Sequence, residues 1–242
     1  MKIALCQINT ILGNFEYNYE KILKNYNRSI DLNADIIVFP ELAITGYPPQ
    51  DLLMNNEFVN ENLSVLNKIA KKSTKPIIIG YVRADEKKIY NSAAICFDGQ
   101  IQSSHDKVLL PTYDVFDEER YFTSGIKPKV STIPFGESEL RVGLQICEDL
   151  WDNNYDCKVS SVQKELGAEI LINISASPYH KDRLIKRRAI IEDKVKKLSL
   201  PFLYCNMVGA QDELIFDGQS IGLSDNGNLI AYGNPFKEEV VL

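Results

Sequence analysis

Three side chains that can do chemistry together, Glu41, Lys107 and Cys147, each lie at or just beyond the end of a run typical of a buried strand. Strand ends in α/β folds hold side chains rigidly while the following loop exposes them. A thiol, with an ordinary pKa of about 8.5, needs a neighbouring base or cation to react as a thiolate. A lysine can supply the charge, and a carboxylate can accept the thiol proton and pass it to a leaving amine. The three residues are therefore a candidate set for nucleophilic catalysis.

Each member of this set also has a structural explanation when it is taken alone. Glu41 would cap a helix, Lys107 would be a solvated loop lysine, and Cys147 would fill the core. Neither histidine of the chain is an obvious partner for the thiol. The combination of the three residues is thus more specific than any one of them.

The cysteines and histidines do not have the spacing of a metal site. Five cysteines are scattered without a pair two residues apart, and His105 and His180 are far apart in the sequence. We expect no metal and a reduced, cytoplasmic protein. Cys6, Cys96 and Cys205 lie in apolar runs and are expected to be small buried hydrophobic residues.

The surrounding elements indicate an α/β fold with a mixed sheet. Short β-branched runs predict buried strands at residues 36–39, 77–79 and 142–146. Apolar residues at helical spacing predict a helix over residues 182–198, whose many basic side chains we expect to form a solvated surface. Asp-Gly and Asn-Gly turns predict hairpins over residues 92–104 and 219–231. Nothing divides the chain, so we expect one domain over residues 1–242.

Composition excludes several classes of protein. The 242 residues carry 27 Lys and Arg against 33 Asp and Glu, a net charge of −6, whereas a protein that coats nucleic acid usually has the opposite balance. The 45% hydrophobic content is enough for a sizeable core. No run approaches the roughly 18 apolar residues that span a bilayer, and we expect no signal peptide or membrane anchor.

Three segments resemble, in order and spacing, the signature segments of the nitrilase, or carbon-nitrogen hydrolase, superfamily: residues 39–41, 106–111 and 146–149. The resemblance implies an αββα sandwich of four layers. It also implies that Glu41, Lys107 and Cys147 form a catalytic set that hydrolyses non-peptide carbon-nitrogen bonds.

A closer resemblance is to the N-terminal glutaminase domains of the glutamine-dependent NAD synthetase family, at residues 41–53, 110–122, 147–151 and 211–218. It implies that the chain hydrolyses glutamine through a glutamyl thioester. The released ammonia would serve NAD synthesis from nicotinic acid adenine dinucleotide by an attached or partner synthetase.

The resemblance assigns ATP and magnesium to a synthetase domain, whose Ser-Gly-Gly-x-Asp-Ser loop is missing from this sequence. The chain is then either an excised domain or a separate glutaminase subunit. It implies no cofactor for the chain itself, and it suggests a homo-oligomer.

Further site residues follow from the resemblance. Glu118 matches a second carboxylate that positions the lysine or the substrate, although it would otherwise be a surface residue of the acidic run 117–119. Tyr113 and Phe116 match positions that line the glutamine pocket, although loop aromatics are often packing anchors.

The substrate also needs partners for its oxyanion, α-carboxylate and α-amine. The backbone N–H of Glu148 would hold the oxyanion together with Lys107. Ser175, Ser177 and Arg183 are candidates for the charged end of the substrate, which cannot be buried without polar partners. Alternatively, Arg183 simply belongs to the basic helix.

Two other functions remain open on the sequence. One is a standalone ω-amidase or N-carbamoyl hydrolase with the same three catalytic residues. The other is a catalytically idle domain that serves as an oligomerisation or docking scaffold. The intact set of Glu41, Lys107 and Cys147 argues against it.

Overall fold

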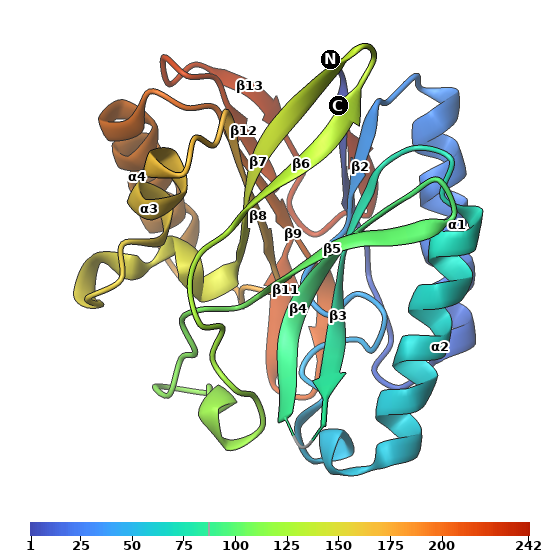
Figure 1. Cartoon of the computed structure of the whole chain (residues 1–242). Helices are drawn as coiled ribbons and strands as arrows, with labels where there is room; N and C mark the ends of the chain where they lie inside the picture. Colours follow the sequence, from blue (N-terminus) through green and yellow to red (C-terminus); the bar gives the residue numbers. More distant parts are fainter. Residues whose placement is uncertain (87) are drawn as a thin grey trace.

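The computed structural model describes residues 1–86 and 88–242, and it has two β-sheets face to face with helices outside both (Figure 1). Helices α1 (Phe15–Asp31) and α2 (Asn56–Lys72) cover one sheet. Helices α3 (Val159–Glu165) and α4 (Arg183–Leu198) cover the other. This arrangement confirms the predicted αββα sandwich.

Within the described residues each of the two sheets has six strands. The first has the order β14 (Glu239–Val241), β1 (Ile3–Gln7), β2 (Ile36–Val38), β3 (Ile77–Asp85), β4 (Lys88–Phe97) and β5 (Gln100–Asp106). The second has the order β13 (Leu229–Tyr232), β12 (Ile221–Leu223), β9 (Phe202–Asn206), β8 (Ile170–Ser175), β7 (Ser138–Ile146) and β6 (Val130–Phe135). A separate ribbon pairs β10 (Val208–Gln211) with β11 (Leu214–Asp217). Both large sheets combine parallel and antiparallel pairs, as the hairpins predicted.

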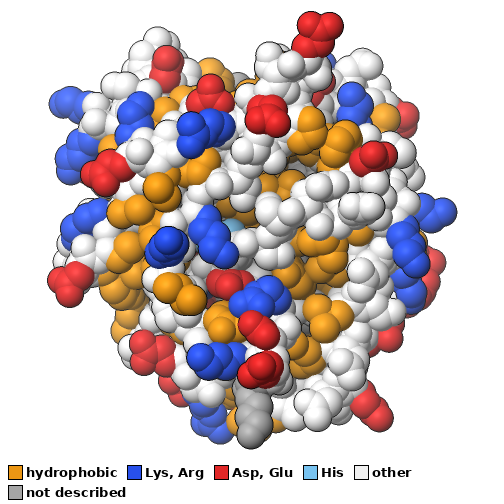
Figure 2. Space-filling view, viewed as in Figure 1, with side chains coloured by type: hydrophobic (Ala, Val, Ile, Leu, Met, Phe, Trp, Pro, Cys, Tyr) orange, Lys and Arg blue, Asp and Glu red, His pale blue; other side chains and the backbone are white. Residues whose placement is uncertain are grey.

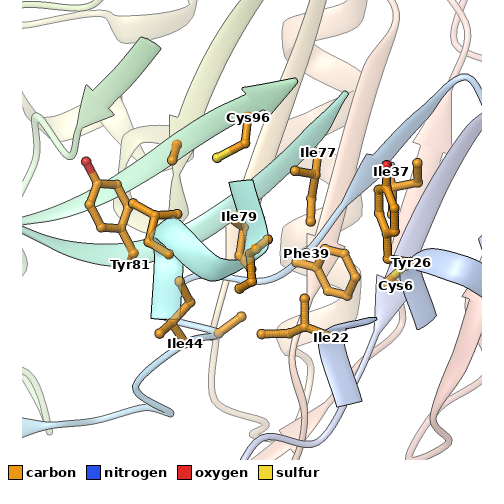
Figure 3. Packing of buried hydrophobic residues seen from close by; sticks show 14 of the residues in the cluster. Cys6, Ile22, Tyr26, Ile37, Phe39, Ile44, Ile77, Ile79, Tyr81 and Cys96 are labelled. Atoms are coloured by element: carbon orange, nitrogen blue, oxygen red, sulfur yellow. The ribbon is translucent and has the colours of Figure 1, made fainter. Parts of the chain in front are cut away.

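Alternation along the strands creates three apolar layers. In β1, Ala4 and Cys6 face α1 and α2, whereas Leu5 faces the opposite sheet. Figure 3 shows the outer cluster, where Cys6 and Cys96 pack among isoleucine and aromatic side chains. Cys205 packs in the layer between the sheets. The prediction that these three cysteines are small buried residues is confirmed.

Both predicted hairpins are present, as β4 with β5 and as β12 with β13. The predicted helix over residues 182–198 begins one residue later, at Arg183, because Asp182 has a left-handed backbone with φ of 67°. Its apolar residues pack against the second sheet as predicted.

The prediction that the basic side chains of α4 are all solvated is wrong at two positions. Arg187 and Lys194 face the protein and are buried. Arg187 pairs with Asp217 at 3.2 Å, and Lys194 pairs with Asp152 at 2.7 Å. Helical periodicity brings every third or fourth residue onto the inner face, and buried carboxylates there compensate the charge.

The visible surface carries charges of both signs. Figure 2 shows Lys and Arg side chains interspersed with Asp and Glu among the coloured side chains of this face. Among the helices of the described residues, none combines the length and the apolar composition needed to cross a bilayer.

Candidate active site

The structure brings the Lys107 ammonium between two carboxylates. Its Nζ atom donates to Glu41 Oε1 at 2.9 Å and to Glu118 Oε1 at 2.8 Å. The side chains of Lys107 and Glu41 are completely buried, and that of Glu118 nearly so. The structural explanation of Lys107 as a solvated loop lysine is therefore wrong, and Glu41 does not cap a helix, because its carboxylate contacts Lys107, Asn91 and the Ala176 backbone N–H.

Glu41 is fixed by both sheets. Besides Lys107, its Oε1 accepts a hydrogen bond from Asn91 Nδ2 on β4 at 2.7 Å. Its Oε2 accepts one from the Ala176 backbone N–H, just beyond β8, at 2.8 Å. Gly80 of β3 allows the close approach that this needs, because a Cβ there would lie 2.2 Å from the Leu42 nitrogen. The carboxylate is therefore held in one orientation.

Cys147 lies on a sharp turn at the end of β7. It opens the short 3₁₀ helix η3 (Cys147–Leu150) and has a left-handed backbone with φ of 43°. Non-glycine residues seldom adopt this conformation, and it is concentrated at functional sites because it costs energy. A nucleophile on such a strand-to-helix turn projects its side chain from the end of the sheet.

Burial and the neighbouring charges together set the protonation state of Cys147. Burial, and next the charge of Glu41, hold the pKa of the Cys147 thiol well above its usual value. Burial alone would lower the pKa of Lys107, but the charges of Glu118 and Glu41 outweigh it and keep that pKa well above its usual value. The resting site therefore holds a protonated thiol beside an ammonium group, and attack needs a base.

Glu118 differs from its neighbours in the acidic run. Asp117 and Glu119 are exposed, whereas Glu118 is buried and also accepts from the Tyr47 hydroxyl at 3.3 Å. Burial raises the pKa of the Glu118 carboxyl to about 7. The alternative of a surface glutamate is therefore wrong, and Glu118 is a second carboxylate on Lys107, as the resemblance implied.

A cavity of about 730 Å³ lies beside the site, lined by Tyr113, Glu148, Trp151 and Tyr155 among others. The Tyr113 and Tyr155 hydroxyls donate to the two Glu148 carboxylate oxygens at 2.8 and 3.0 Å. Burial raises the pKa of Glu148 above its usual value. A carboxylate in the lining of the cavity suits a cationic group on a ligand.

A second cavity, of about 240 Å³, lies on the Glu118 side. Tyr47, Phe116 and Glu118 are among its lining residues. Phe116 meets Tyr113 edge-on, with ring centroids 5.8 Å apart. Of the two predicted pocket aromatics, Tyr113 thus lines the first cavity and Phe116 lines the second.

The remaining predicted substrate residues lie elsewhere. Ser175 is buried and its hydroxyl donates to Asn173 Oδ1 at 2.7 Å, while the Ser177 backbone N–H donates to Asn206. Arg183 packs over the Trp151 ring at 5.2 Å. Ser175, Ser177 and Arg183 are not among the described residues that line the two cavities.

Four groups that hydrogen-bond to the carboxylates of the site were not predicted from the sequence: Tyr47, Asn91, Tyr155 and the Ala176 backbone N–H. Tyr47 lies in the 41–53 segment that carried the resemblance, which was the available signal. An asparagine in a strand or a tyrosine in a loop gives no such signal. The described residues contain no group of three or more His, Cys, Asp or Glu arranged to hold a metal.

Comparison with known proteins agrees with this geometry. Residues 2–242 match the carbon-nitrogen hydrolase family model, so the chain belongs to that family. The glutamine-dependent NAD(+) synthetases of Thermotoga maritima and of a Synechocystis species are 38% and 36% identical to it over 100% and 99% of its length. The chain spans less than half of these relatives, 41% and 45%.

Solved structures extend the comparison. The glutamine-dependent NAD+ synthetase of Acinetobacter baumannii, in complex with adenosine diphosphate, superposes with a TM-score of 0.91 at 32% identity, over 98% of this chain and 44% of that one. An amidase from Nesterenkonia sp. has the same fold, with a TM-score of 0.84 at 20% identity, over 100% of this chain and 88% of that one. The resemblance to the nitrilase superfamily is confirmed.

Proposed function

We propose that residues 1–242 form one glutamine amidohydrolase domain that releases ammonia for NAD synthesis. The observation that carries this proposal is the buried Lys107 ammonium between Glu41 and Glu118, close enough to Cys147, on its left-handed turn, for all three charges to act on the thiol. The match to glutamine-dependent NAD(+) synthetases over the whole chain supports glutamine as the amide.

In the first step the Cys147 thiol attacks the side-chain amide carbon of glutamine. Glu41 takes the thiol proton as the carbon-sulfur bond forms, because the raised pKa of the thiol keeps it protonated at rest. The amide oxygen becomes an oxyanion, which Lys107 and the Glu148 backbone N–H stabilise. One such donor is commonly worth about two to three orders of magnitude in rate.

In the second step Glu41 returns its proton to the departing nitrogen and ammonia leaves. The product is a glutamyl thioester on Cys147. Water, activated by the same carboxylate, then attacks the thioester carbonyl and releases glutamate and the free thiol. The reaction balances as glutamine plus water to glutamate plus ammonia, and the chain's own residues supply every proton transfer.

Substrate recognition falls to the larger cavity. The Glu148 carboxylate would attract the α-ammonium group, while Tyr113 would bound the aliphatic part, with Phe116 of the second cavity packed edge-on against it. Arg183, which packs on the Trp151 wall, is the candidate partner of the α-carboxylate. Ser175 and Ser177 would support the pocket without touching the substrate, because both side chains are buried.

The partner of this domain would be a synthetase domain or subunit that binds ATP and magnesium and uses the ammonia. The length of the relatives, of which the chain spans less than half, supports a further synthetase part. We further propose a cytoplasmic homo-oligomer with no cofactor of its own.

The test is release of ammonia and glutamate from glutamine by the purified chain, beside asparagine and a carbamoyl compound. Cys147→Ala should abolish release of ammonia. Cys157→Ala, at a half-buried cysteine that is not one of the candidate catalytic residues, should not. Hydrolysis of another amide in preference to glutamine would refute the substrate assignment. A chain that is silent without its synthetase should still be labelled at Cys147 by a glutamine-mimicking electrophile, and no labelling would refute catalysis.

A further inference from the structure

Asp149, two residues after Cys147, gathers three backbone donors on one carboxylate. Its Oδ1 accepts from the N–H groups of Val108 and Leu109 at 3.0 and 2.9 Å. Its Oδ2 accepts from the Ile146 N–H at 3.0 Å and lies 3.4 Å from Nε2 of His105. The side chain is completely buried. A buried carboxylate whose two oxygens both accept backbone hydrogen bonds holds those backbone segments rigidly together.

The donors come from the two sheets of the sandwich. Ile146 ends β7 in the second sheet and directly precedes Cys147. Val108 and Leu109 directly follow Lys107, just beyond β5 of the first sheet. The carboxylate of Asp149 therefore joins the backbone next to the nucleophile to the backbone next to the lysine.

The two oxygens of a carboxylate match this set of contacts. Both oxygens must accept, since each faces at least one backbone N–H. In an asparagine, one oxygen is replaced by an NH₂ group, which would face either Ile146 N–H or the Val108 and Leu109 pair, donor against donor. Hydrogen bonds to a carboxylate are also about twice as strong as neutral ones.

We propose that Asp149 is a positioning residue that fixes the Lys107 ammonium relative to the Cys147 sulfur and thereby to the oxyanion. It does not touch the substrate, because its carboxylate is occupied by the protein backbone. The proposal rests on the hydrolase function proposed above. If Asp149 were purely structural, its loss would change only stability. A positioning role predicts that turnover depends on this carboxylate as well.

Asp152 provides a matched control. It is also a buried carboxylate in the same segment, in the 3₁₀ helix η4 (Asp152–Asn154), and it pairs with Lys194 of α4 at 2.7 Å. It makes no hydrogen bond to the segment that follows Lys107 among the described residues. Asp152→Asn therefore disturbs a buried ionic contact of the same region without loosening the catalytic pair.

The experiment compares Asp149→Asn and Asp152→Asn with the wild-type chain, under conditions in which urea unfolding shows all three to be folded. We expect Asp149→Asn to lower kcat for glutamine by roughly 10- to 100-fold with KM changed less than about threefold. Asp152→Asn should keep kcat within about threefold. Equal kcat values for the two folded variants would overturn the proposal.

A second readout does not depend on the substrate. Lys107 lowers the pKa of the Cys147 thiol, so a displaced ammonium should slow alkylation of Cys147 by iodoacetamide and move its pH profile to higher pH. Asp149→Asn should show both effects and Asp152→Asn neither. This result would support the positioning role even if glutamine proved not to be the substrate. Unchanged alkylation in Asp149→Asn would overturn it.

A second variant covers the case in which Asp149→Asn does not fold. His105→Phe keeps a ring of similar size in a buried position and removes only the Nε2 contact to Asp149. We expect it to lower kcat by about 3- to 10-fold, with slower Cys147 alkylation. Wild-type values for both would overturn the proposal.

Discussion

Lys107 Nζ lies 2.9 Å from Glu41 Oε1, and this buried ion pair joins the end of β2 to the end of β5. Asn91 donates to the same oxygen of Glu41. The Glu41 carboxylate is therefore already held in place for its proposed role as the base toward Cys147. The Lys107 ammonium is likewise held in place, so in the proposed mechanism it would need no reorganisation when the oxyanion forms.

Lys107→Met should reduce turnover far more than binding. The change keeps the side-chain volume but removes the charge that stabilises the oxyanion, and it leaves two buried carboxylates without a cation. We expect kcat for glutamine to fall by roughly 10²- to 10³-fold. Steady-state kinetics with Lys194→Met as the buried-lysine control measures this, and an effect on KM alone would assign Lys107 to substrate binding.

Glu41→Gln should block proton transfer at little steric cost. The amide cannot act as a base at neutral pH, so we expect kcat to fall by roughly 10²- to 10⁴-fold. Circular dichroism should show an intact fold, and Glu119→Gln, at an exposed glutamate, should behave as the wild type. If Glu41→Gln kept full turnover, a different base would have to take the proton from Cys147.

Glu118 should make stability depend on pH. Its pKa is about 7 in the folded chain, mainly through burial, against about 4.5 for the ordinary carboxyl. Since the folded state binds the proton more tightly, the stabilising contribution is complete below about pH 4.5 and is lost as pH rises through 7. Relative to Glu118→Gln, the wild type should lose roughly 1–3 kcal/mol over that range. Urea unfolding at several pH values tests this, and a difference that is constant with pH would contradict it.

Arg187 should be important for stability because it forms a buried pair with Asp217. Arg187→Leu leaves that carboxylate uncompensated and should cost roughly 3–5 kcal/mol. The control is Arg188→Ala, which breaks an exposed pair with Glu192 one residue along the same helix and should cost at most about 0.5 kcal/mol. Thermal or urea unfolding measures both, and similar costs would mean that burial of the Arg187 pair is unimportant.

The sequence by itself indicated an α/β fold with a mixed sheet and the identity of the three central residues, and the family resemblance implied the four layers. Strand runs, hairpin turns and the apolar period of α4 are local signals, since each depends on neighbours within a few residues. Glu41, Lys107 and Cys147 were found because their residue types follow strands and match the signature segments of a family. The sequence also suggested Glu118, although it could not separate this residue from its exposed neighbours.

Only the tertiary structure decided how these residues are held. Asn91 and the Ala176 N–H reach Glu41 from 50 and 135 residues away along the chain. Asp149 meets Val108 across the two sheets, and Arg187 is buried against Asp217 although its helix looked solvated. Contacts between distant segments depend on how the sheets pack face to face, and local patterns carry no information about that packing.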